Sequence, residues 1–138
     1  MEYCSHLWAG APIDCLHLLD RIQKRICVAI GYPLASKLDS LSHRRNVASL
    51  SLFYRYFHGH CSAELTQLVP PLRTFKRATR FSSSSHNFTV QTPPSKSFYA
   101  NSFFPRTAKL WNSLPVKCFP PTYNLQVFKS NVHRHLLS

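Results

Sequence analysis

Residues 42–58 read Ser-His-Arg-Arg-Asn-Val-Ala-Ser-Leu-Ser-Leu-Phe-Tyr-Arg-Tyr-Phe-His, and this stretch decides the expected fold. Its apolar side chains recur at steps of three and four residues, at Val47, Leu50, Tyr54 and Phe57. That spacing is typical of one face of an α-helix. Three arginines lie largely on the other faces, at Arg44, Arg45 and Arg55. Gly59 follows as a natural helix end, so the stretch predicts an amphipathic helix that needs an apolar partner.

Three further helices are expected from the same kind of spacing, over residues 12–30, 104–114 and 122–137. The first carries the apolar stripe Leu16, Leu19, Ile22, Ile26 and Ile30. The second begins around Pro105 and ends before Pro115, and the third follows a plausible N-cap at Thr122. We expect the helices at 12–30 and 42–58 to pack on those at 104–114 and 122–137.

Residues 71–100 differ from both flanks, because they combine arginines and lysines with four consecutive serines at 82–85 and prolines at 93–94. Within them, residues 88–92 alternate β-prone side chains and predict at most one short β-strand or hairpin. The expected fold is therefore mainly α, with about four helices and an irregular basic Ser/Pro-rich middle. Its predicted parts are an N-terminal helical part at 1–70, a linker at 71–100 and a C-terminal two-helix part at 101–138.

Composition narrows the function further. Among 138 residues, 17 Lys and Arg face 5 Asp and Glu, which gives a net charge of +12. Only 3 glycines accompany 10 prolines, so a Gly-rich nucleotide loop is excluded. The acids are scattered, at Glu2, Asp14, Asp20, Asp39 and Glu64. They form no closely spaced motif for catalytic Mg²⁺ or for a general acid and base. We expect no enzyme activity, no cofactor and no small-molecule substrate.

Location is read from what the sequence lacks. No apolar run approaches the roughly 18–20 residues of a membrane span, and the N-terminus has no signal-peptide pattern. The five cysteines are odd in number and widely spaced, which favours reduced thiols over a disulfide framework. We expect an intracellular protein, cytoplasmic or nuclear, with no membrane partner.

The basic stretch at 73–81 predicts contact with nucleic acid. Its cations can neutralise phosphates, while Phe75 and Phe81 are placed to stack on unpaired bases. The alternative is a solvated loop whose phenylalanines pack on the helices. The candidate phosphate-binding residues are Arg73, Lys76, Arg77 and Arg80, with Arg44, Arg45 and Arg55 in a secondary role.

A zinc site is not expected. His58, His60 and Cys61 lie close in sequence, and Cys4 with His6 offers a second pair, but no Cys-x-x-Cys spacing occurs. Histidines at a helix end before and after Gly59 suit the helix dipole instead. We interpret His133 and His135 as polar-face residues of the last helix.

Aromatic side chains are numerous. Trp111 is interpreted as an apolar anchor. Together, however, six aromatics exceed what four short helices readily bury: Trp8, Phe53, Phe57, Phe103, Phe104 and Trp111. They predict a surface that is covered by another domain, and therefore a marginally stable chain on its own.

Five segments together resemble the C-terminal end of the reverse transcriptases of non-LTR retrotransposons, of the jockey and CR1-like kind. Residues 2–12 and 18–25 read Glu-Tyr-Cys-Ser-His-Leu-Trp-Ala-Gly-Ala-Pro and Leu-Leu-Asp-Arg-Ile-Gln-Lys-Arg. Residues 43–47 lead to 52–59, which read Leu-Phe-Tyr-Arg-Tyr-Phe-His-Gly. Residues 101–115 end in the box Trp-Asn-Ser-Leu-Pro, and residues 128–130 close the match with Phe-Lys-Ser.

The resemblance covers nearly the whole chain and implies a thumb-like and post-polymerase region that handles template RNA and primer. The polymerase and endonuclease motifs of that family lie upstream, so no catalytic residue is carried over, and Met1 would fall inside normally continuous coding sequence. The expected function is a non-catalytic, sequence-tolerant contact with the RNA or DNA backbone. Two alternatives stay open: a structural or protein-interaction module that docks on the upstream polymerase domain, and a translated relic of a truncated element without activity.

Overall fold

The computed structural model describes residues 3–31, 35–74, 86–92 and 97–137. The described residues are mainly helical, which confirms the expected fold class. They contain two long helices, α2 (Ile13–Ile30) and α3 (Leu41–Phe57), and two shorter core helices, α6 (Phe103–Asn112) and α7 (Leu125–Leu137). Single turns complete them: α1 (Ser5–Trp8), α4 (Ala63–Gln67), η1 (Ala35–Lys37), η2 (Ser97–Asn101) and η3 (Val116–Cys118). No helix among these is long and apolar enough to cross a bilayer.

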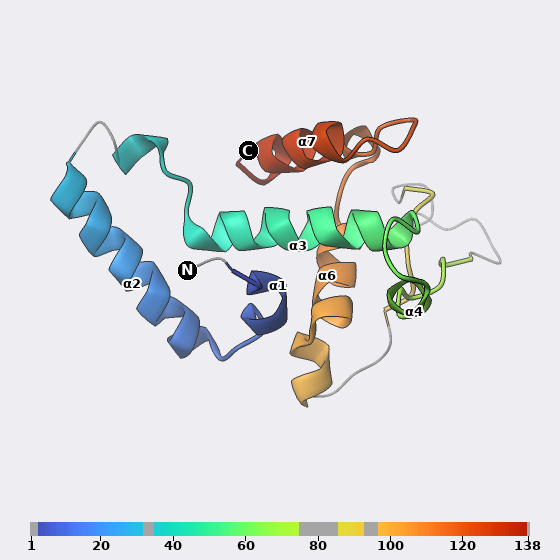
Figure 1. Ribbon diagram of the computed structural model, residues 1–138, viewed down its shortest axis with the longest axis horizontal. Helices are drawn as coiled ribbons and strands as arrows, with labels where there is room; N and C mark the ends of the chain where they lie inside the picture. The colour runs from blue at the N-terminus through green and yellow to red at the C-terminus, as the bar shows by residue number, and fades with distance from the viewer. Residues whose placement is uncertain (1–2, 32–34, 75–85, 93–96, 138) are drawn as a thin grey trace.

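Helix α3 is the centre of the fold (Figure 1). It begins where the Ser40 hydroxyl accepts a hydrogen bond from the His43 amide at 3.1 Å, an N-cap that satisfies one otherwise unpaired donor. It ends before Gly59, whose φ of 71° lies in the left-handed region that favours glycine. Helix α7 runs antiparallel along one side of α3, and α6 packs on another (Figure 1). The predicted helices at 42–58, 104–114 and 122–137 are confirmed to within a few residues.

The core is aromatic, and it contains two of the six aromatic residues that were expected to exceed what the helices can bury, Phe53 and Trp111. Phe53, Tyr54, Trp111 and Phe128 are each at most 1% exposed. Tyr54 stacks on Phe128 with ring centroids 4.1 Å apart, and Phe53 lies 4.9 Å from Trp111. Phe57, Phe103 and Phe104 pack around this centre. The prediction is therefore wrong for Phe53 and Trp111, because α3 contacts two other helices, while the remaining four rings are partly buried.

Helix α2 differs from the other long helix. It forms where expected, at 12–30, but it packs chiefly on α3 and η1, not on α6 and α7 as predicted. None of its residues is buried. Six of its apolar side chains are between 43% and 82% exposed: Ile13, Leu18, Ile22, Ile26, Val28 and Ile30. In Figure 1 it stands at the edge of the molecule, on the opposite side from α4.

The strand expected at 88–92 is reduced to one antiparallel bridge between Leu72 and Val90. The Arg73 amide donates to the Thr89 carbonyl and the Gln91 amide to the Pro71 carbonyl, both at 2.8 Å. Among the described residues no further strand pairs with it. The predicted parts at 1–70 and 101–138 share one core nevertheless, because α3 packs on both α6 and α7.

Candidate nucleic-acid interface

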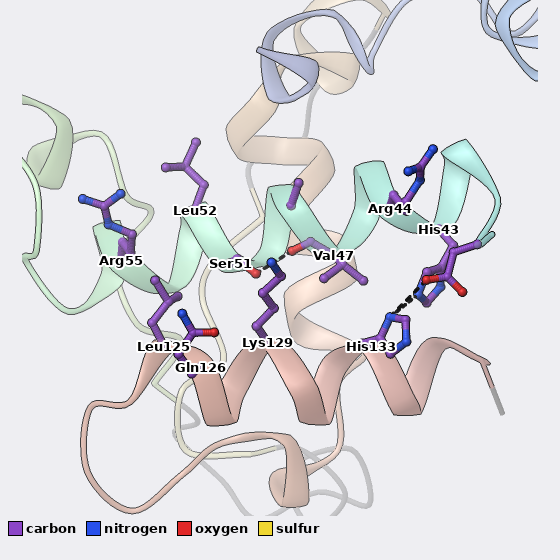
Figure 2. A pocket seen from close by; sticks show the side chains of 12 residues that line it. His43, Arg44, Val47, Ser51, Leu52, Arg55, Leu125, Gln126, Lys129 and His133 are labelled. Carbon is purple, nitrogen blue, oxygen red and sulfur yellow. Dashed lines mark hydrogen bonds and ion pairs between the residues drawn. The ribbon is translucent and has the colours of Figure 1, made fainter. Parts of the chain in front are cut away.

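The packing of α3 on α7 leaves a groove of about 550 Å³ along their seam (Figure 2). Its apolar lining comes from Val47, Ala48, Leu52 and Leu125. The Ser51 hydroxyl, which also lines it, is turned back to donate to the Val47 carbonyl at 2.7 Å. The groove therefore combines an apolar lining with charged side chains from both helices.

Three cations line the groove: Arg44 and Arg55 on α3 and Lys129 on α7. Arg55 and Lys129 are exposed, and Arg55 also donates to the His60 carbonyl at 3.4 Å. Figure 2 shows Lys129 extending from α7 toward Ser51. The one carboxylate in the lining is Asp39, so the groove carries a positive excess. An elongated positive groove of this kind attracts phosphates.

The N-terminal end of α3 closes the groove with a group of three polar side chains. His43 Nε2 and His133 Nδ1 lie 2.8 Å apart and share a hydrogen bond, and the two rings meet edge to face. Asp39 Oδ2 lies 3.7 Å from His133 Nδ1. His43 is 9% exposed, whereas the side chains of His133 and Asp39 are 42% and 33% exposed. This end of the groove is thus partly open to solvent.

The predicted phosphate-binding residues do not all meet in this groove. Arg44 and Arg55 line it, but Arg45 is 4% exposed, with Nη2 3.2 Å from Asp20 Oδ1 and its guanidinium 5.9 Å from the ring of Trp8. It lies on the face of α3 that α1 and α2 cover. Its guanidinium is therefore buried inside the fold and is not placed to contact phosphates. Arg73 lies away from the groove, beside the Leu72–Val90 bridge. Lys76, Arg77 and Arg80, like Phe75 and Phe81, lie outside the described residues.

The histidines after α3 have other partners. His60 stacks on Tyr123 at a centroid distance of 3.7 Å, and the Cys61 thiol lies 3.2 Å from the Thr66 hydroxyl. Burial lowers the pKa of His58, and the neighbouring His60 lowers it further. The candidate metal-ligating group in the described part of the chain is instead Asp39, His43 and His133.

Four ionisable residues of this groove were not expected as site residues from the sequence: Asp39, His43, Lys129 and His133. Asp39 and His43 are four residues apart at a helix start, a spacing that could have been noticed. His133 lies 90 residues further on, and only the antiparallel packing of α7 brings it there. His133 does lie on a polar face of α7, as expected, but that face borders α3.

Comparison of the chain with known protein families, with curated proteins and with solved structures finds no match. The resemblance to non-LTR reverse transcriptases therefore stays a prediction that rests on the sequence segments alone.

Proposed function

We propose that this chain binds the phosphate backbone of RNA or DNA, with little sequence preference and without catalysis, as the C-terminal region of a retrotransposon reverse transcriptase would. The observation that carries the proposal is the cationic groove between α3 and α7, on a chain with a net charge of +12. Cations that neutralise phosphates release counterions, and this supplies most of the affinity in sequence-independent binding.

The proposed contact set differs from the set expected from sequence. Arg44 and Arg55 are retained, Lys129 is added, and Arg45 is left out because it is buried against Asp20 and Trp8. The basic stretch with Arg73, Lys76, Arg77 and Arg80 remains the second part of the proposed interface. The groove offers side chains of mixed type and no Phe, Tyr or Trp among its lining residues, which suits backbone contact better than base stacking.

The test is the salt dependence of affinity for a single-stranded oligonucleotide. The double variant Arg55→Gln/Lys129→Gln removes two exposed groove cations, and we expect the slope of log K against log salt to fall by roughly 1.4. Lys24→Gln/Arg25→Gln on α2 is the matched control, since it removes the same charge from exposed positions elsewhere. An equal fall in both variants would show that net charge alone matters and that the groove is not the site.

The basic stretch is tested separately by changing Arg73, Lys76, Arg77 and Arg80 together to Ala. Loss of four phosphate contacts would lower the slope by roughly 2.8. If the unaltered chain shows no salt-dependent binding to any oligonucleotide, the proposal fails and the relic interpretation is favoured.

A second candidate function is docking on a polymerase domain of the kind that the resemblance implies. It is favoured by the exposed aliphatic side chains of α2, which contrast with the buried aromatics of the core. Addition of a non-LTR reverse transcriptase domain should slow amide exchange in α2 and leave exchange in α7 unchanged. Unchanged exchange in α2 would exclude this docking surface.

A further inference from the structure

The polar group at the end of the groove has the composition of a metal site. We propose that Asp39, His43 and His133 bind one divalent transition-metal ion of the Zn²⁺ type, with three protein ligands and one position open to solvent. The three ligand atoms lie within 4.8 Å of one another, and they come from the turn before α3, from its first turn and from α7. Nothing in the proposed nucleic-acid contact requires this ion, so the two proposals stand or fall separately.

The spacing of the ligand atoms is close to what a tetrahedral ion needs. Metal bonds of about 2.0–2.2 Å place two ligand atoms of a tetrahedron about 3.3 Å apart. His43 Nε2 and His133 Nδ1 are 2.8 Å apart, and Asp39 Oδ2 is 3.7 Å from His133 Nδ1. These two values lie on either side of the required distance, and all three ligand atoms lie within 4.8 Å of one another, so adjustments of at most about 1.5 Å in any one ligand-to-ligand distance bring them around one centre.

Binding of the ion to the two histidines requires no further reactant to take up or supply protons. In the hydrogen bond between the histidines, one of the facing nitrogens carries the proton and the other accepts it. A bound ion takes the lone pairs of both nitrogens, so the donor ring gives up that proton and takes one at its other nitrogen. If one of the rings is charged beforehand, one proton is released to solvent for each ion bound.

The backbone around two of the ligands is held by α2. The Gln23 side chain donates to the Asp39 carbonyl and accepts from the Leu41 amide, both at 2.8 Å. The Ser40 cap fixes the His43 amide in the same turn. This clamp places Asp39 and His43 before any ion arrives, which lowers the entropy lost on binding. It also gives α2 a positioning role at the site, through Gln23.

The ligand types and the exposure of the site decide which ion is suited to it. Two imidazoles and one carboxylate favour Zn²⁺, Co²⁺, Ni²⁺ or Cu²⁺ over Mg²⁺ and Ca²⁺, which prefer oxygen ligands. Entry is possible because His133 and Asp39 are partly exposed. The nearby groove cations Arg44 and Lys129 oppose a further positive charge, and the Asp39 carboxylate offsets part of that repulsion. A bound ion would join the start of α3 to α7 and hold the groove at this end.

The experiment uses the full chain, freed of metal with a chelator and kept reduced, and titrates it with Co²⁺ followed by Zn²⁺ as competitor. We expect one equivalent of Co²⁺, with visible absorption typical of nitrogen and oxygen ligands and without the near-ultraviolet charge-transfer band of thiolate ligands. His133→Gln and Asp39→Asn should each weaken binding by at least about tenfold. The control His17→Gln, at an exposed position of α2, should bind as the unaltered chain does.

Both ligand variants change partly exposed side chains, so they should fold, and circular dichroism checks this. His43 is more deeply buried, and its substitution is not needed for the decision. Unchanged Co²⁺ affinity in His133→Gln, or a thiolate band that is lost in Cys61→Ser, would overturn the proposal and place the ion elsewhere. Loss of the Co²⁺ spectrum in both ligand variants, with retention in His17→Gln, would support it.

Discussion

Helices α2 and α3 have nearly the same length, 18 and 17 residues, and both carry apolar stripes. They nevertheless differ in how far their side chains are buried. Eight residues of α3 are buried, and none of α2 is. The difference lies in the partners. Helix α3 contacts α6 on one side and α7 on another, whereas α2 packs chiefly on the already occupied α3 and on η1. An apolar stripe thus predicts a helix. Whether the stripe is buried depends on how many other helices have an apolar face available to pack on it.

The side-chain types separate the two helices as well. The apolar residues of α3 include Phe53, Tyr54 and Phe57, which reach Trp111 and Phe128 across the helix interfaces. Those of α2 are aliphatic: isoleucines, leucines and a valine. The Tyr54 hydroxyl accepts a hydrogen bond from the Asn124 amide at 3.2 Å, just before α7 begins, and so ties the core to the start of that helix. The contact between α2 and α3 includes polar groups, because Gln23 accepts from the Leu41 amide and Arg45 pairs with Asp20.

The largest expected effect comes from Trp111→Ala. The ring is fully buried and lies within 5.2 Å of the rings of Phe53, Phe57 and Phe119, centroid to centroid. Its Nε1 also donates to the Phe88 carbonyl at 2.7 Å. Removing it should cost about 3–5 kcal/mol of unfolding free energy, measured by urea denaturation. That is a large share of the about 5–15 kcal/mol typical of a domain.

Trp8→Ala is the matched control for this change. Trp8 is only partly buried in α1, where its Nε1 donates to the Tyr3 carbonyl and its ring lies near Arg45. Trp8→Ala should therefore lower the unfolding free energy clearly less than Trp111→Ala does. Equal losses for the two tryptophans would mean that the stability of the chain is not concentrated around α3, α6 and α7.

A smaller effect is expected from Asn112→Ala, next to Trp111. The Asn112 side chain accepts from the Val90 amide at 2.9 Å and donates to the Val90 carbonyl at 2.8 Å. Because Val90 is fully buried, its two backbone groups would lose their partners, at a cost of about 1–3 kcal/mol. Hydrogen exchange at the Val90 amide should accelerate. Ser113→Ala, at an exposed neighbour, should change the unfolding free energy by less than about 0.5 kcal/mol.

The core should also respond to acid. His86 is buried with both ring nitrogens bonded: Nδ1 accepts from the Phe88 amide at 3.2 Å, so Nε2 carries the proton and donates to the Trp111 carbonyl at 3.0 Å. Burial lowers the pKa of His86, although the Trp111 carbonyl opposes this in part. The unfolded chain therefore takes up a proton near its ordinary pKa of about 6.5, before the folded chain does. Stability should fall as pH drops from that value through the folded pKa.

The measurement is the midpoint of thermal unfolding between neutral and mildly acidic pH. His86→Gln keeps a donor for the Trp111 carbonyl but no longer titrates, so its stability should depend less steeply on pH. His58, whose pKa is also lowered, contributes in the same direction and leaves some dependence in this variant. His17→Gln, at an exposed site, should keep the full dependence. A pH slope that His86→Gln leaves intact would place the titrating group elsewhere.

The helices were predictable from sequence, and so was the role of Trp111 as an apolar anchor, whereas the Trp-Asn-Ser-Leu-Pro box was noticed only as part of a resemblance. The structure gives that unit physical reasons: Trp111 fills the core, Asn112 holds Val90, and Leu114 is buried behind them. Periodicity reports which side chains share a face, because it depends only on neighbours along the chain. The spacing of prolines and glycines located the helix ends for a similar reason.

The candidate site was less predictable, because it depends on pairs that lie far apart in the sequence. Nothing local distinguishes Arg45, which pairs with Asp20, from Arg44, which lines the groove one residue earlier. Rotation by one residue moves a side chain about 100° around a helix, and the fold decides which side is covered. His43 and His133 meet only because α7 returns antiparallel to α3, and no spacing within either segment signals this.

The smallest effect is expected on α2, where Ile22→Ala and Ile26→Ala remove methyl groups that are already about half in water. Each side chain is more than 40% exposed, and Ala is the better helix former, so each change should alter the unfolding free energy by less than about 0.5 kcal/mol. Leu50→Ala in α3, at a fully buried position, should cost about 2–5 kcal/mol and serves as the comparison. If the isoleucine changes instead cost well over 1 kcal/mol each, the apolar face of α2 must be covered in solution. Sedimentation would then separate two causes: a mass above 15.9 kDa that falls in the variants would show that copies of the chain cover this face, and a monomer would show that α2 packs more closely on α3.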